Sequence, residues 1–369
     1  MARAAELIEN EGVRVDFVDI NCGCPLDLVC SKGMGAACMG KIGKLRDCVL
    51  QMDRILSCPV TLKMRTGLEK DESARFAHKI VHKVRLWNAS HAVGDDDLSI
   101  FSRLPVAAIT VHGRTRQQRY SAYADWSYIE RCAAAASSPT FEYPLSNLLD
   151  GLVIPSGPPS ARLLASLGIV EGSPSAAALA ASSRNAILNV SPPTLPVIGN
   201  GDVLSWQDWE AHTGASAGAG GAAVASCMIA RGALIKPWLP REIKERRDWD
   251  ISSGERLAIL QDFVNFGLEH WGSDQQGVNH TRRFLLEWLS FLHRYVPVGL
   301  IERLPMRIND RPPSMFGRDD LETLMMSPYA EDWVKISELL LGPVPEDFRF
   351  VPKHKSSGTA EAGKAEAEG

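Results

Sequence analysis

Short apolar runs alternate with polar or glycine-bearing loops through most of the chain. The runs have the length and composition of buried strands, and segments with helical spacing follow them. Strands that alternate with helices indicate βα units around a parallel sheet. We therefore predict an α/β protein with strands at Val15–Asn21, Val60–Met64, Ala108–Val111, Val197–Asn200 and Cys227–Ala230.

Each predicted strand ends in a chemically distinctive group: "NCGCP", "KMRTG", "HGRT", "GNGD" or "ARG". Polar groups at the carboxyl ends of successive parallel strands build the active sites of (β/α)8 barrels. The glycine fingerprint of an open dinucleotide-binding sheet is absent from the sequence. We predict a TIM-barrel type of fold with about five βα units. Because a closed barrel has eight strands, we expect an amino-terminal truncation ahead of Val15.

Helical spacing takes over after residue 244. Two apolar faces are formed by Leu257, Leu260, Val264, Leu268 and Trp271, and by Leu285, Trp288, Leu292 and Tyr295. A further short helix is expected over residues 332–341. The predicted organisation is a catalytic barrel domain over 1–243, a helical domain over 244–350 and a disordered tail over 351–369.

Residues 133–195 do not fit this plan. Alanine, serine and proline fill 31 of the 63 positions, so the segment offers little to pack. We predict a low-complexity insertion that is a loop or disordered. Residues 213–226, rich in alanine and glycine, have the same interpretation, and a smaller excess lies at about 88–106. We expect these segments to be translated non-coding sequence from an imperfect gene model.

Composition and motif spacing add four limits. The net charge of −4 gives no overall basic field, so attraction to a nucleic acid would come from local patches. Eight cysteines are too few for a disulfide scaffold. The spacing of Cys22, Cys24, Cys30 and Cys38 does not match structural zinc motifs, so no metal is predicted. No secretory signal or membrane-spanning apolar run is present, so we expect a cytoplasmic or also nuclear location and no membrane partner.

The motifs together carry a family resemblance. "NCGCPLDLVCSKGMGAA", "LKMRTG", "ITVHGRTRQQRYSAYADW", "VIGNGDV" and "MIARGALIKPW" occur in this order, and the chain resembles the flavin-dependent tRNA-dihydrouridine synthases. The helical stretch "TRRFLLEWLSFLHRYVPVGLIERLPMRINDRPP" is similar to the branch that acts on uridine 47. The resemblance implies reduction of a tRNA uridine to 5,6-dihydrouridine by FMN, with NADPH or NADH as the reductant. tRNA is the expected partner, and no protein partner is predicted.

The resemblance also assigns roles to particular residues. Cys24, which precedes Pro25, matches the catalytic acid, and a thiol pKa of about 8.5 suits a group that holds its proton near neutral pH. Cys22 stands where an aliphatic residue is typical and receives no role. The expected flavin-binding residues are Lys63, His112, Asn200, Gly201, Asp202, Ala230 and Arg231. The expected substrate-binding residues are Asn21, Arg116 and Gln117.

Physical chemistry supports several of these assignments. The charge of Lys63 would stabilise an anionic reduced flavin. Arg231 would add a charged contact to the flavin phosphate. A basic loop with a neighbouring aromatic residue, over residues 114–120, suits contact with phosphates and bases of RNA.

Other interpretations remain open at the level of sequence. Cys24 could be a buried structural cysteine, and the basic loop could be a solvated surface. The chain could be a non-catalytic RNA-binding fragment unable to hold FMN, because barrel strands are missing. A flavin barrel that reduces a free pyrimidine is a third interpretation. The arginine-rich loop and the helical appendage argue against it, because a small base needs neither.

Overall fold

The computed structural model describes residues 1–12, 14–93, 105–118, 122–138, 194–213, 224–300, 315–345 and 348–353. The chain divides into two compact units. The first comprises Met1–Gly201 and Ala211–Met228, and the second comprises Asp202–Glu210 and Ile229–Gly369. Most of the predicted insertion (139–193), residues 214–223 and the tail from residue 354 lie outside the described residues.

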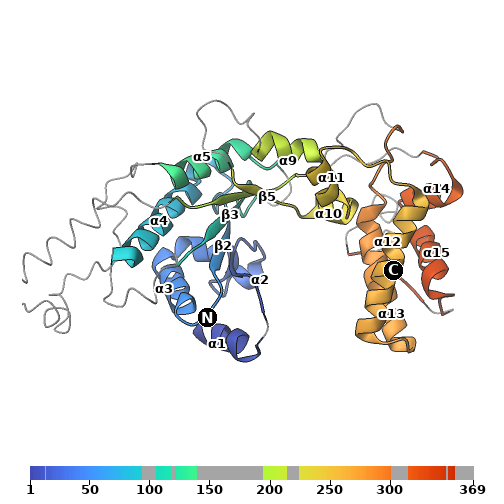
Figure 1. Ribbon diagram of the computed structural model, residues 1–369, viewed down its shortest axis with the longest axis horizontal. Helices are drawn as coiled ribbons and strands as arrows, with labels where there is room; N and C mark the ends of the chain where they lie inside the picture. Colours follow the sequence, from blue (N-terminus) through green and yellow to red (C-terminus); the bar gives the residue numbers. More distant parts are fainter. Residues whose placement is uncertain are drawn as a thin grey trace, which may run out of the picture. The chain divides into compact units, whose positions relative to one another are not determined.

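A parallel sheet forms the centre of the first unit (Figure 1). Its strands in the described residues are β1 (Val18–Cys22), β2 (Val60–Arg65), β3 (Ala108–His112), β4 (Val197–Asn200) and β5 (Ser226–Met228). Each strand pairs with the next along the chain, so the order is β1-β2-β3-β4-β5. Sequential parallel pairing is the arrangement of a (β/α)8 barrel. The five predicted strands are confirmed, with ends shifted by up to three residues.

One helix precedes the first strand of the first unit, and others follow its strands. Their bounds are α1 (Ala2–Asn10), α2 (Asp27–Cys30), the 3₁₀ helix η1 (Gly35–Gly40), α3 (Ile42–Asp53), the 3₁₀ helix η2 (Glu72–Ala74), α4 (Ala77–Val93) and α5 (Trp126–Ser137). Helix α9 (Trp206–Thr213) is divided between the two units.

Side-chain alternation gives the sheet two different faces. Ile20, Leu62 and Ile109 share one row across β1, β2 and β3, and all three are buried. The same core contains Val49 of α3 and Val84 of α4. Burying each such side chain contributes about 1.5–3 kcal/mol. This apolar layer stabilises the sheet and leaves the opposite face to polar side chains.

The first residues of the predicted insertion are helical. Helix α5 continues through Ser137, and Ala133, Ala135 and Ala136 are buried. Alanine has the highest helix propensity, and its small side chain lets α5 pack against α4. The prediction of a loop is therefore wrong for residues 133–137, because alanine-rich composition was interpreted without its packing partner.

The described part of the second unit is helical. Its helices are α10 (Arg231–Ile235), α11 (Leu239–Glu245), α12 (Ser253–Trp271), α13 (Gln275–Leu292), α14 (Asp320–Met326) and α15 (Ala330–Leu341). α12 and α13 lie side by side (Figure 1), and their core includes Leu260, Val264, Leu285 and Leu292. The centres of both predicted apolar faces and the short helix over 332–341 are confirmed.

Two residues of those faces behave differently. Trp271 is 36% exposed at the end of α12. Tyr295 lies beyond α13 and packs in a separate cluster with Trp238 and Ile251. Helical periodicity predicts that both residues belong to the main core. In the structure, Trp271 is the last residue of α12 and Tyr295 lies after the end of α13, so neither is part of that core.

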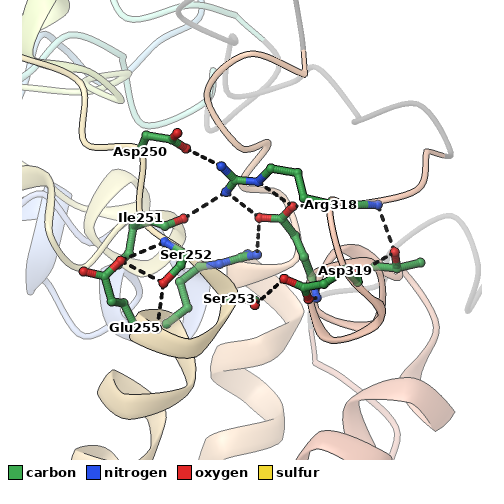
Figure 2. A network of polar contacts seen from close by, with 11 residues as sticks. Asp250, Ile251, Ser252, Ser253, Glu255, Arg318 and Asp319 are labelled. Atoms are coloured by element: carbon green, nitrogen blue, oxygen red, sulfur yellow. Dashed lines mark hydrogen bonds and ion pairs between the residues drawn. The ribbon is translucent and has the colours of Figure 1, made fainter.

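An ion-pair network joins the start of α12 to α14 (Figure 2). The Glu322 carboxylate pairs with Arg256 at 3.3 Å and with Arg318 at 2.8 Å. Arg318 also pairs with Asp250 at 2.7 Å. The side chains of Arg256 and Glu322 are fully buried, and the hydrogen bond from Arg318 lowers the pKa of Glu322. Positive and negative groups therefore alternate through this network.

Candidate functional site

The register of the first three strands collects polar side chains on the face opposite the helices. Asn21, Lys63 and Thr110 lie in one row across β1, β2 and β3. One row nearer the strand amino termini, the Thr61 hydroxyl donates to the Asp19 carboxylate at 2.7 Å. The predicted residues Asn21 and Lys63 are thus neighbours at the carboxyl ends of adjacent strands.

Cys24 lies in a short loop immediately after β1. Asn21 Oδ1 accepts hydrogen bonds from the backbone N–H groups of Gly23 and Cys24, both at 3.0 Å. The Cys24 carbonyl accepts the Ala36 N–H at 2.9 Å. The Cys24 thiol is free and half-buried. The loop therefore presents an unmodified thiol on a backbone fixed from both sides.

Asn21 contributes mainly to the geometry of this loop. Its side-chain oxygen, predicted to contact substrate or flavin, is used by the two backbone N–H groups. Within the described part of the chain, Asn21 Nδ2 has no hydrogen-bond partner. The amide end that can still donate to a ligand is therefore Nδ2.

Gly35 closes the other side of the Cys24 loop. Its φ of +58° lies in the left-handed region, and a Cβ placed on it would be 2.7 Å from the Cys24 carbonyl oxygen. A side chain at this position is excluded by both conformation and space. The end of the motif "NCGCPLDLVCSKGMGAA" thus packs directly on Cys24, although the sequence analysis did not single out Gly35.

Arg65 connects the Cys24 loop to the loop after β3. Arg65 Nε donates to the Gly23 carbonyl at 2.7 Å, and Nη1 donates to the Thr115 carbonyl at 2.8 Å. The Arg65 side chain is buried. Sequence reasoning left this residue unassigned, because its partners lie 42 and 50 positions away. The structure shows that Arg65 holds two strand-end loops together.

Lys63 is a partly buried cation on the polar face. Burial lowers the pKa of its amino group, Arg65 lowers it further, and Asp19 acts in the opposite direction. No carboxylate of the described residues forms an ion pair with Lys63. An anionic ligand would relieve this unfavourable burial of charge.

His112 ends β3 beside a buried arginine. His112 Nε2 lies 3.2 Å from Arg114 Nη1, and a guanidinium can only donate, so Nε2 is the acceptor. The ring proton is therefore on Nδ1. Arg114 Nε also donates to the Ala122 carbonyl at 2.6 Å.

Asn200 ends β4 and pairs with this histidine in the sheet, and Gly201 follows it. Asn200 Nδ2 donates to the Met228 carbonyl at 2.7 Å, which ties β4 to β5. Gly201 has a φ of +121°, and a Cβ there would lie 2.6 Å from Ala124 and 3.1 Å from His112. Gly201 therefore allows the close approach of β4 and the His112 ring.

The remaining predicted flavin-binding residues belong to the second unit. Ala230 precedes α10, and Arg231 is its first residue. Arg231 Nη2 lies 3.8 Å from Asp202 Oδ1, so the structure brings together two residues that are 29 positions apart. Gly232 is needed here because a Cβ would lie 2.3 Å from the Val203 carbonyl oxygen.

Arg116 and Gln117 are engaged by the chain itself. Arg116 pairs with Asp27 of α2 at 2.8 Å. Gln117 Nε2 donates to Glu69 at 2.6 Å, and its Oε1 accepts the Lys70 N–H at 3.1 Å. These contacts connect the loop after β3 to α2 and to the loop after β2. Residues 119–121 of the predicted basic loop lie outside the described residues.

Two kinds of feature are absent from the described residues. No group of three or more His, Cys, Asp or Glu side chains in them is arranged to hold a metal ion. None of their helices is both long and apolar enough to cross a membrane. The strand ends of the first unit instead combine a free thiol, a partly buried amine, an imidazole donor and a buried arginine.

Comparison with known proteins relates this arrangement to one family. The model of the dihydrouridine synthase (Dus) family matches residues 1–87 and 186–290. The chain is 46% identical over 357 residues to the tRNA-dihydrouridine(47) synthase [NAD(P)(+)]-like protein of Rattus norvegicus, which covers 97% of this chain and 43% of the relative. The protein of that name from Homo sapiens is also 46% identical over 357 residues, with 97% and 42% covered.

A fungal relative gives the same result. The tRNA-dihydrouridine(47) synthase [NAD(P)(+)] of Cryptococcus neoformans var. neoformans serotype D is 42% identical over 374 residues, covering 100% of this chain and 41% of the relative. The chain thus spans about two fifths of the length of the curated relatives it matches. The family model matches more than half of the residues, and the chain belongs to the dihydrouridine synthase family.

Proposed function

We propose that this protein reduces a uridine of tRNA to 5,6-dihydrouridine, with FMN as cofactor and NADPH or NADH as reductant. The observation that carries the proposal is the free Cys24 thiol in the loop after β1, a strand whose Asn21 pairs with Lys63 of β2. The names of the relatives support tRNA as the substrate and position 47 as the target.

The polar face of the first unit is suited to a flavin. Lys63 is a partly buried cation without a carboxylate ion-pair partner among the described residues, as expected where an anionic ring system binds. Of the other residues that would hold FMN, His112, Asn200 and Gly201 belong to the first unit, and Asp202, Ala230 and Arg231 to the second. When bound, reduced FMN supplies the hydride for C6 of the uracil.

Cys24 would hold the proton that is transferred to C5. A thiol stays largely protonated near neutral pH and is a stronger acid than an alcohol, which suits a general acid. Its backbone is fixed by Asn21 and Gly35, and Arg65 fixes the adjoining Gly23 carbonyl. This preorganisation keeps the acid in place without using the thiol itself in a hydrogen bond of the loop.

The helical domain over residues 244–350 would contribute to tRNA binding. Residues 231–318, which begin ahead of this domain and leave out its last 32 residues, contain 14 Arg and Lys against 11 Asp and Glu, a local charge of +3. Over residues 244–350 the count is 13 against 18, so any attraction to tRNA would be local. Within the first unit, Arg116 would bind substrate only by leaving its exposed pair with Asp27, which costs about 0–1 kcal/mol. Gln117 would require the loss of two contacts.

The test is conversion of an unmodified tRNA transcript. The purified chain is incubated with FMN, NADPH and the transcript, and dihydrouridine is measured by nucleoside mass spectrometry. A matched transcript with cytidine at position 47 tests the target position. Dihydrouridine in the first transcript alone supports the proposal. Bound flavin without any dihydrouridine, in a chain confirmed to be folded, would contradict it.

A further inference from the structure

The segment that begins α5 is hydrogen-bonded to the ends of two neighbouring strands. The Asp125 N–H donates to the carbonyl of Gly113, directly after β3, at 2.7 Å. The Trp126 indole Nε1 donates to the carbonyl of Gly201, directly after β4, at 3.0 Å. Two consecutive residues therefore hold two adjacent strand ends, and the second of these bonds comes from a side chain.

Two glycines allow the Trp126 segment to approach β4 closely. A Cβ on Gly199 would overlap the six-membered ring of Trp126, and a Cβ on Gly201 would lie 2.6 Å from the Ala124 Cβ. Neither glycine has room for a side chain. The Trp126 ring also stacks on His212, with centroids 3.6 Å apart and an interplanar angle of 5°. These contacts restrict the ring, so its Nε1–H is held toward the Gly201 carbonyl.

The hydrogen bond from Trp126 controls the direction of a backbone donor. Because a peptide is planar and trans, fixing the Gly201 carbonyl also fixes the N–H of the next residue, Asp202, in the opposite direction. Both residues have a positive φ, +121° for Gly201 and +55° for Asp202. A residue with a side chain keeps this conformation where its surroundings hold it, and such residues are concentrated at functional sites. The Asp202 N–H is thus directed away from the indole.

We propose that Trp126 is a positioning residue for binding the phosphate group of the flavin. The inference rests on the proposed function, in which Gly201 and Asp202 belong to the residues that would hold FMN. Phosphate sites of (β/α)8 barrels form in the loops after the last two strands, and β4 and β5 are the last two strands of the described sheet. Turns that present backbone N–H groups bind anions. Trp126 acts by orienting the Gly201–Asp202 peptide toward this group.

Flavin titration of the full chain and two matched variants tests the proposal. Trp126→Phe keeps an aromatic ring but removes the Nε1 donor. Tyr128→Phe, two residues later in α5, is the control, because it removes a hydrogen bond of similar kind, to the His78 ring at 2.6 Å, that does not reach a strand end. Quenching of flavin fluorescence gives the dissociation constants for FMN and for riboflavin, which lacks the phosphate.

The expected effect is specific to the phosphate. Trp126→Phe should bind FMN about five- to tenfold more weakly than the wild type, and riboflavin within about twofold of it, because one hydrogen bond to the phosphate-binding strand end is lost. Tyr128→Phe should bind both flavins within about twofold of the wild type. Circular dichroism establishes that each variant is folded.

Two further measurements sharpen the test. In the chain without flavin, amide hydrogen exchange of residues 199–202 should be faster in Trp126→Phe and unchanged in Tyr128→Phe. Trp126→His can place a ring N–H where the indole Nε1 lies, since both nitrogens belong to five-membered rings. This second variant should bind FMN at least about threefold more tightly than Trp126→Phe.

Three results would overturn the inference. The first is an equal loss of FMN and riboflavin affinity in Trp126→Phe, which would indicate a structural role alone. The second is an FMN-specific loss of the same size in Tyr128→Phe. The third is wild-type FMN affinity and wild-type exchange of residues 199–202 in Trp126→Phe. A folded wild-type chain that binds neither flavin would instead contradict the proposed function itself, and the inference with it.

Discussion

Buried arginines hold loops in both units, but their partners differ. Arg65 of the first unit bonds two backbone carbonyls and lies close enough to Lys63 to lower its pKa. Arg256 of the second unit pairs with the Glu322 carboxylate, which Arg318 also contacts. The first unit therefore places two like charges near each other, whereas the second alternates opposite charges.

This difference separates a site from a structural network. Neighbouring like charges destabilise each other, and such groups are concentrated where a protein binds or transforms a ligand. Alternating buried charges compensate each other and fix one packing arrangement, but they leave no charge for a ligand. The comparison supports placing the proposed chemistry at the strand ends of the first unit.

The largest effect is expected from breaking the charge network of the second unit. Glu322→Gln would leave Arg256 buried without its carboxylate, and we expect the free energy of unfolding to fall by about 3–5 kcal/mol. Urea unfolding followed by tryptophan fluorescence reports on this unit, which contains seven of the nine tryptophans. Asp250→Asn, at the more exposed end, should cost less than about 1 kcal/mol. Equal losses in the two variants would contradict the account.

Breaking the Arg65 clamp should have the next largest effect. Arg65→Lys keeps the charge, but an ammonium group cannot reproduce the two hydrogen bonds that one planar guanidinium donates. We therefore expect the free energy of unfolding to fall by about 2–3 kcal/mol. Hydrogen exchange should show faster opening of residues 22–25 and of the loop after β3. Arg116→Lys, which changes only a surface pair, is the control and should leave exchange of both loops within about 0.5 kcal/mol of the wild type. Unchanged protection of both loops from hydrogen exchange in Arg65→Lys would contradict the role of Arg65 in holding them together.

Gly35→Ala tests whether the backbone beside the Cys24 loop requires glycine at one position. Its positive φ and the closeness of the Cys24 carbonyl predict a loss of about 1–3 kcal/mol in the free energy of unfolding. Gly43→Ala in α3 is the matched control, since a Cβ there meets nothing within 4 Å. That variant should gain up to about 1 kcal/mol because alanine favours the helix. The opposite order of stabilities would contradict the role given to Gly35.

Acid should weaken the second unit through His293. Burial lowers the pKa of this imidazole from 6.5 to about 4. Between those values the unfolded chain binds a proton that the folded chain does not, so stability is lost as the pH falls through that window. Between about pH 7 and pH 5, we expect the free energy of unfolding of His293→Gln to fall by about 1–2 kcal/mol less than that of the wild type. Exposed His270→Gln is the control, and an identical pH slope in His293→Gln would contradict this assignment.

The strands could be predicted from the sequence, but only part of the candidate site could. Each strand is a short apolar run with a polar or glycine end, and that local pattern does not depend on distant residues. The clamp of Arg65 was not predictable, because its two carbonyl partners come from loops after other strands. Asn21 was predicted to bind a ligand, whereas its oxygen holds the Cys24 backbone.

Composition was the least reliable guide. Composition predicts that the alanines at 133–136 begin an unpacked insertion. In the structure, three of these alanines, Ala133, Ala135 and Ala136, are buried residues of α5. Whether a small residue is core or linker depends on the element that packs against it, here α4. A sequence without its partner surface does not contain that information.

The most direct test of the central claim compares two cysteines in the same loop region. Dihydrouridine formation on tRNA is measured for Cys24→Ala and for Cys30→Ala, whose wild-type thiol donates to the Cys24 carbonyl at 3.3 Å. If Cys24 supplies the proton, Cys24→Ala lowers the rate by at least about 100-fold while flavin binding is retained, and Cys30→Ala stays close to the wild type. A wild-type rate in folded, flavin-bound Cys24→Ala would contradict the account.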